Sequence, residues 1–215
     1  MSTEAHDAPD RPPVSLMKEF KKRPRADISR SLPKVHVRPP RWCSSQTIAK
    51  SDDLCVSEFE RLQIIHLESF RIAVDSRDWG AIHNRHFDWW QFPIDDGSRV
   101  EFNMKSESDI DTLRSNPDWL FRYRESVKLV ALAWGWDIDA CCLVEDGGVW
   151  DKKDVRLAKI IRSLWLFEQC DYFTSMQKYA HQINDNVYNK RGFRYGRICL
   201  DEILYMKLPR RYCPL

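Results

Sequence analysis

The chain has 215 residues and a formal net charge of +2, and 43% of its residues are hydrophobic, with nine tryptophans. This length suits one domain with a tail or two small domains, and the composition suffices for a substantial core. Seven glycines are too few for a glycine-rich barrel, and the sequence lacks the run of about 20 apolar residues that a membrane span needs. The composition therefore predicts a soluble protein that has no membrane among its partners.

The seven cysteines are scattered along the chain. No two of them have the two-residue separation that is typical of a structural zinc site. An odd and scattered set is typical of reduced thiols inside a cell. We therefore expect a cytoplasmic protein with no metal and no other cofactor.

Residues 1–50 are predicted to form a basic, proline-rich arm. Residues 11–50 carry eleven Lys and Arg against two acids, whereas residues 51–185 carry 16 against 25 and residues 186–215 carry seven against two. Seven of the eleven prolines lie within the first 40 residues, and proline disfavours regular structure. The arm is either a solvated leader or a strap that binds an acidic partner or a nucleic-acid backbone.

The strap hypothesis assigns partner contacts to the basic residues of the arm, because Lys and Arg replace counterions along phosphates. A cluster of these residues also fits a short nuclear-import signal, which predicts a nuclear location if the host cell has a nucleus. The residues that we assign to partner binding are Lys21, Lys22, Arg23, Arg25, Arg38 and Arg41.

Residues 51–215 are expected to form one helical domain, whose first helix covers about residues 54–76. The apolar residues of this segment recur at helical spacing. The expected apolar face comprises Phe59, Leu62, Ile65, Phe70 and Ala73.

Residues 79–92 form an aromatic segment that is dense in rings and is followed by Pro93. After a turn, residues 99–105 are expected to form a short extended segment. Trp89 and Trp90 are adjacent, so their side chains diverge, and we expect one in the core and the other on a contact surface. Because Trp dominates binding hot spots, both are candidate partner-binding residues.

Clear start and stop signals predict the remaining helices. Asn116 followed by Pro117 is a cap with proline at the first helical position, and Gly135 is a natural stop. The predicted helices cover about residues 107–115, 117–134, 151–167, 171–183 and 200–206. The fold is therefore predicted to be mainly α, an irregular orthogonal bundle of five or six helices.

A histidine pair in the aromatic segment gives the sequence its candidate metal site. His83 and His86 are three residues apart, so one helical turn would bring them together. Asp88 could complete a set of two histidines and one carboxylate, which activates water in metal-dependent hydrolases and nucleases. The competing interpretation is an aromatic cluster whose polar residues satisfy the indole N–H groups.

The helix predicted after Asp151 carries Lys152, Arg156 and Lys159 along one stripe. Such a stripe is either a solvated helical face or a contact for phosphate or an acidic partner. On the second interpretation, Arg156 and Lys159 bind the partner.

Residues 80–185 resemble the conserved region of the opioid growth factor receptor family. The shared order runs from a histidine-led aromatic stretch at residues 83–93, through helices at 107–111 and 126–135, to a basic and apolar helix at 156–167. The chain differs from that family by its second histidine, its paired tryptophans and its lack of a long repeat tail. The resemblance implies a helical domain that binds a partner and has no settled enzymatic activity.

We therefore expect a non-enzymatic binding protein, an adaptor-like subunit or accessory factor of a nucleoprotein or protein complex. It would bind protein, nucleic acid or both through the basic arm and the aromatic surface. The alternative is a metal-dependent hydrolase or nuclease with His83, His86 and Asp88 as its catalytic residues.

Overall fold

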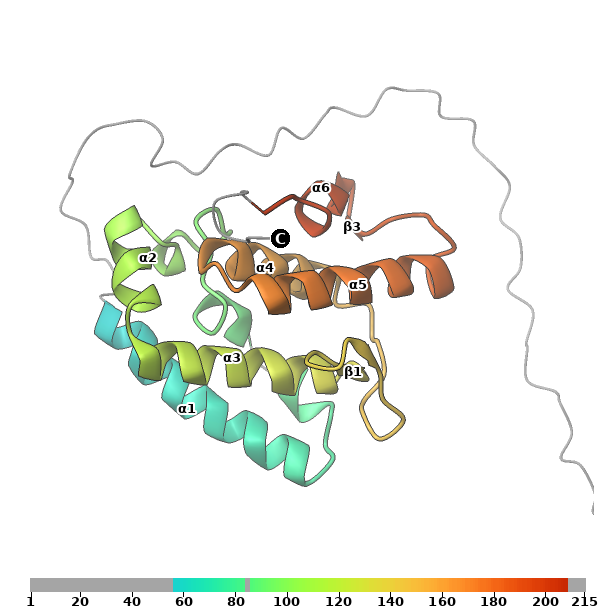
Figure 1. Ribbon diagram of the computed structural model, residues 1–215, viewed down its shortest axis with the longest axis horizontal. Helices are drawn as coiled ribbons and strands as arrows, with labels where there is room; N and C mark the ends of the chain where they lie inside the picture. Colours follow the sequence, from blue (N-terminus) through green and yellow to red (C-terminus); the bar gives the residue numbers. More distant parts are fainter. Residues whose placement is uncertain (1–55, 84–85, 209–215) are drawn as a thin grey trace, which may run out of the picture. The chain divides into compact units, whose positions relative to one another are not determined.

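The computed structural model describes residues 56–83 and 86–208. These residues are mainly helical, which confirms the predicted fold class (Figure 1). Over the same ranges, no helix is both long enough and apolar enough to cross a membrane. The helices are α1 (Val56–Asp75), α2 (Glu107–Arg114), α3 (Pro117–Leu132), α4 (Asp154–Leu166), α5 (Cys170–Asn186) and α6 (Asp201–Leu204).

The ends of α3 follow from the local sequence. The Asn116 side chain accepts a hydrogen bond from the backbone N–H of Trp119 at 3.0 Å, and Pro117 occupies the first turn, where its missing N–H costs nothing. Gly135 has a φ of +75°, and a Cβ there would lie 2.5 Å from the carbonyl oxygen of Gly148. Glycine is therefore required at this stop.

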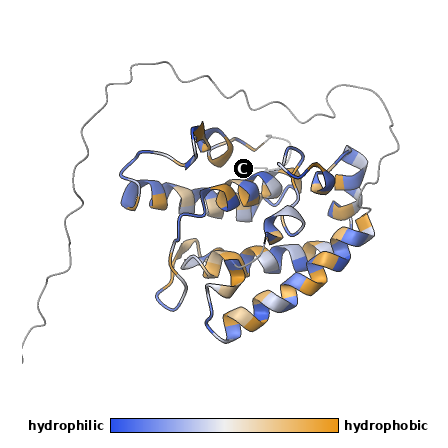
Figure 2. Cartoon of the chain, turned by 180° about the vertical axis from the view of Figure 1, so that it is seen from behind, coloured by the Kyte–Doolittle hydropathy of each residue, from blue (hydrophilic) through white to orange (hydrophobic). Residues whose placement is uncertain are grey.

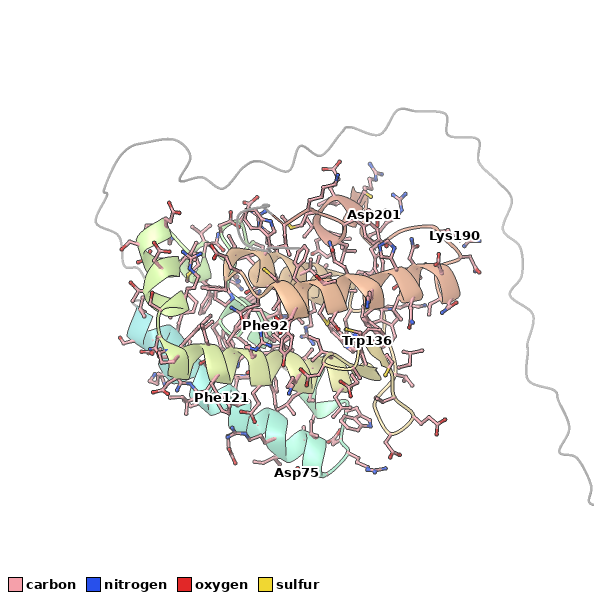
Figure 3. All side chains as sticks on the ribbon, viewed as in Figure 1. Asp75, Phe92, Phe121, Trp136, Lys190 and Asp201 are labelled. Carbon is pink, nitrogen blue, oxygen red and sulfur yellow. The ribbon has the colours of Figure 1, made fainter. Side chains whose placement is uncertain are left out.

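Helices α3 and α4 hold the core. On α3, Trp119, Tyr123 and Val127 are fully buried, and the rings of Trp119 and Tyr123 stack at 4.9 Å. Phe92, labelled in Figure 3, packs against Tyr123 at a ring distance of 6.0 Å. Helix α4 contacts α5, α6 and the aromatic segment, so it is apolar on several sides.

The prediction that Ile65 belongs to the apolar face of α1 is wrong, because this residue is 47% exposed. The buried face instead includes Gln63 and His66, and Nδ1 of His66 accepts a hydrogen bond from the indole N–H of Trp90. Gln63 donates to the carbonyl oxygen of Trp119 at 3.4 Å and accepts from Arg122 at 3.0 Å, so its burial leaves its amide satisfied. Figure 2 shows apolar and hydrophilic residues interspersed along α1, and Ile64 and Ile72 are 53% and 62% exposed.

The prediction of an extended segment near residues 99–105 is wrong for the middle of that segment. A 3-10 turn, η4 (Val100–Phe102), interrupts it, although Arg99 and Asn103 on either side have extended backbones. Two more 3-10 turns, η2 (Ala81–His83) and η3 (Phe87–Trp89), occupy the aromatic segment.

Two short antiparallel hairpins were not predicted. Strand β1 (Trp136–Asp137) pairs with β2 (Cys142–Leu143), and β3 (Arg194–Tyr195) pairs with β4 (Ile198–Cys199). Two-residue strands are too short to produce a visible alternation of apolar and polar residues. Cys141, Cys142 and Cys199 have free thiols.

Candidate functional site at Trp89

The aromatic segment is fixed to α4 by a buried cluster of charged side chains. Asp88 accepts a hydrogen bond from Lys159 Nζ at 2.7 Å, and Arg156 Nε lies 3.4 Å from its other carboxylate oxygen. The Asp88 and Lys159 side chains are only 7% and 10% exposed. Removing one partner of a buried ion pair costs about 3–5 kcal/mol, so this cluster holds the segment firmly on the helix.

A second buried pair fixes the loop that follows. Arg162 donates two hydrogen bonds to the Asp95 carboxylate, at 2.9 and 2.6 Å. The loop is closed at its base, because the N–H of Met104 donates to the carbonyl oxygen of Ile94 at 2.9 Å. Two further hydrogen bonds join the Asn103 side chain to the backbone N–H and carbonyl of Gly97, so charge pairing and local hydrogen bonds together set the path of residues 94–104.

These contacts correct the expected orientation of the α4 cations. Lys152 lies outside the helix and is exposed, but Arg156 is half-buried, and Lys159 and Arg162 are buried. They do not form an outward stripe, and Arg156 and Lys159 act within the domain as partners of Asp88.

Trp89 lines a small cleft above this charged cluster. The cleft has a volume of only about 10 Å³, and its walls include Phe102, Arg99 and Lys159. Pockets for drug-sized ligands usually measure about 300–1,000 Å³. The cleft is therefore too small for a ligand and holds about one water molecule, so Trp89 offers a partner a surface and not a pocket.

Stacked rings surround Trp89. The exposed ring of His86 lies parallel to it, at a centroid distance of 4.7 Å and an interplanar angle of 4°. Phe102 stacks on Trp89 at 5.9 Å. We call these three residues the Trp89 ladder, which ends at the solvent-exposed His86.

Two cations also lie against the Trp89 ring. The Arg99 guanidinium is 4.8 Å from the ring centroid, and Lys159 Nζ is 5.9 Å away. These two groups already interact with the π-electrons of the ring, and their positive charges would repel a further cation. The ladder therefore favours a flat, neutral or anionic group.

Trp90 has a different environment from its neighbour. It packs against the core, and its indole N–H donates to Nδ1 of the buried His66 at 3.2 Å. Both tryptophans are half-buried, but Trp90 faces the core and Trp89 the cleft, as the divergence of adjacent side chains predicts.

His83 is held as a neutral imidazole. Burial lowers its pKa to about 4, and the adjacent Arg156 adds to the effect. Its Nε2 accepts a hydrogen bond from the indole N–H of Trp134 at 3.1 Å, and Arg156 Nη1 lies 3.0 Å from Nδ1. Both ring nitrogens are therefore occupied by neighbouring protein groups.

The candidate metal set is not assembled in the structure. His83 faces Trp134 and Arg156, His86 stacks on Trp89, and Asp88 is bound by Lys159. Within residues 56–83 and 86–208, no three His, Cys, Asp or Glu side chains converge as metal ligands. The geometry does not join these residues into one catalytic centre.

The sequence interpretation missed Arg99 and Phe102, which turn toward Trp89 only because the loop folds back. It also missed the pairing of Arg162 with Asp95. A usable signal was present, since α4 carries Leu157, Ala158 and Leu166 on different sides of the helix. A helix that is apolar on several sides is buried, and its charged residues then need internal partners.

Comparison with protein-family models, with curated proteins and with solved structures finds no match. The likeness of residues 80–185 to the opioid growth factor receptor family stays a prediction. The basic residues assigned to partner binding in the arm, Lys21 to Arg41, lie outside the described residues.

Proposed function

We propose that this protein is a non-enzymatic binding module, a subunit or accessory factor of a nucleoprotein or protein complex. The Trp89 ladder is its contact surface on the helical domain, and the basic arm adds electrostatic attraction. The observation that carries the proposal is the ladder, an aromatic stack that is open to solvent at His86.

The contacts that hold the Trp89 ladder in one conformation support this proposal. Binding costs less free energy when the contact side chains are already ordered. Trp89 directly follows Asp88, which two cations hold, and the ring is enclosed by His86 and Phe102. A rigid aromatic surface with a neighbouring Arg99 has the composition that is typical of binding hot spots.

Fluorescence anisotropy on the full chain tests the proposal with three labelled probes: a single-stranded RNA 20-mer, a single-stranded DNA 20-mer and a poly-glutamate peptide. At least one probe should bind and be recovered intact in the presence of Mg²⁺. Trp89→Ala should weaken binding about tenfold or more. Phe121→Ala, at a 67% exposed ring on α3, is the matched control and should stay within about twofold.

Two results would overturn the proposal. Equal affinity of the Trp89→Ala variant and the unchanged protein would remove the ladder from the contact surface. Cleavage of an oligonucleotide, lost on His86→Ala, would favour the metal-dependent nuclease.

A further inference from the structure

The arginines of the described residues divide into two groups. Within residues 56–83 and 86–208, nine of the twelve form ion pairs with carboxylates, and Arg61, Arg71 and Arg77 are examples on α1 and just after it. The three that form none in this part of the chain are Arg191, Arg194 and Arg197, and all of them lie between α5 and α6. Unpaired guanidinium groups are thus gathered in one hairpin.

The hairpin presents an aromatic ring among these cations. Tyr195 and Ile198 lie opposite each other across the two strands, so their side chains share one face. They are 62% and 48% exposed. Gly196 forms the turn with a φ of +57° and open space around it. The basic hairpin, residues 190–198, therefore combines an exposed ring with a rim of positive charge.

The nearby carboxylates are occupied by other groups of the protein. Asp154 accepts hydrogen bonds from the hydroxyl of Tyr188 at 2.5 Å and from the backbone N–H of Arg194 at 3.1 Å. Asp201 accepts from the backbone N–H of Phe193 at 2.8 Å. The carboxylates stabilise the hairpin backbone and leave its guanidinium groups to solvent.

The base of the hairpin is rigid. Phe193 is fully buried and packs edge to face against Tyr188 and Trp150, at ring distances of 5.1 and 6.4 Å. Figure 3 shows Lys190, a fourth exposed cation, just beyond the end of α5. The cations project from a fixed platform, which lowers the entropic cost of binding.

We infer that the basic hairpin binds single-stranded nucleic acid, with phosphates on its arginines and a base stacked on Tyr195. One guanidinium group can donate two parallel hydrogen bonds to one phosphate. An exposed aromatic ring between cations is the usual surface on which an unpaired base stacks. RNA and single-stranded DNA share this chemistry. An anionic membrane fits less well, because one tyrosine and one isoleucine offer little apolar area for insertion.

The inference rests on the proposed role as a binding module, but it uses a different surface from the Trp89 ladder. The test is anisotropy of the full chain with labelled single-stranded RNA and DNA 20-mers over a range of salt concentrations. The test variants are the triple substitution R191Q/R194Q/R197Q and the single substitution Tyr195→Ala. The matched control, R61Q/R71Q/R77Q, removes the same three charges from ion-paired arginines.

The triple hairpin variant should lose about tenfold or more in affinity for at least one of the two oligonucleotides, and the slope of log affinity against log salt should fall by about 2, at roughly 0.7 per phosphate contact. The control should stay within about threefold, as expected for charges removed far from the ligand. Tyr195→Ala should cost about fivefold or more, and Tyr195→Phe, which keeps the ring, should not.

Equal affinities of the hairpin variant and its control would overturn the inference. If Trp89→Ala still weakened binding, the proposed function would stand. The inference would also fail if neither oligonucleotide bound while vesicles with 30% phosphatidylserine did, because the hairpin would then recognise lipid headgroups. If poly-glutamate were the only probe that bound, and Trp89→Ala weakened that binding, the hairpin inference would fail and the proposed function would stand.

Discussion

Arg162 of α4 and Asp95 of the loop after the aromatic segment form a two-point ion pair that is almost fully buried, with side chains 8% and 4% exposed. Arg162 also lies over the ring of Trp165 at 4.9 Å. Two residues 67 positions apart thus determine how the wall of the Trp89 cleft folds back onto α4.

Breaking this pair on one side should be more damaging than removing it altogether. Asp95→Asn leaves the Arg162 charge buried without its partner and should lower the free energy of unfolding by about 3–5 kcal/mol. The double variant D95L/R162M replaces both charges with apolar groups and should recover much of that loss. Urea unfolding of both variants measures the difference, and equal losses would contradict the structural role of the pair.

The stability of the domain should fall as the pH is lowered from about 6.5 to about 4. The folded-state pKa of His83 is about 4, below its ordinary value of 6.5, so over this interval the unfolded chain binds a proton that the folded chain does not. Above pH 6.5 both states are neutral at His83, and the effect vanishes. His83→Gln should flatten the slope between pH 6.5 and 4.

Urea unfolding at intervals of half a pH unit checks this prediction. Hydrogen bonds from Arg124 lower the pKa of Asp171, but that carboxylate releases its stabilisation only below its ordinary value of 3.8, outside the interval. An unchanged slope in the His83→Gln variant would show that other groups cause the acid sensitivity.

The two adjacent tryptophans should separate stability from binding. Trp90→Ala removes a ring that packs on the core and leaves His66 without its indole donor, so it should cost about 3 kcal/mol. Trp89→Ala loses stacking with His86 and Phe102 and should cost about 1 kcal/mol, or a few degrees in Tm. Thermal melts decide between this account and a purely structural cluster, in which both variants would unfold equally.

Removal of residues 1–50 should weaken binding and leave the helical domain folded. Residues 11–50 carry eleven Lys and Arg against two acids, and such a segment gains affinity by displacing counterions from phosphates. The truncated protein should keep its far-UV circular dichroism per helical residue and lose salt-dependent affinity for an oligonucleotide. Full and salt-insensitive binding by the truncated protein would exclude the strap.

The sequence predicts those parts of the fold that depend on local chemistry. Asn116 and Pro117 start α3, and Gly135 ends the helical turn that follows it. These signals are local, because caps, proline and positive φ act within a few residues. The start predicted at Asp151 is three residues early, since Lys152 has a positive φ and α4 begins at Asp154. Local sequence signals therefore place the first residue of a helix only to within a few residues.

The parts that could not be predicted depend on contacts between distant residues. Arg156 and Lys159 fit an exposed stripe until Asp88, about 70 positions earlier, folds onto them. Gln63 is buried because Trp119 and Arg122 satisfy its amide. Spacing along a helix shows which residues share a face, but not whether that face meets solvent or another segment.

Photo-cross-linking of the full chain to a 20-mer RNA with randomly placed 4-thiouridine, with the peptides identified by mass spectrometry, tests the central claim most directly. The account predicts cross-links in the peptides that carry His86, Trp89 and Phe102, and their loss in the Trp89→Ala variant, while Phe121→Ala leaves them in place. Cross-links confined to other surfaces, such as the outer side of α3 around Phe121, would contradict it.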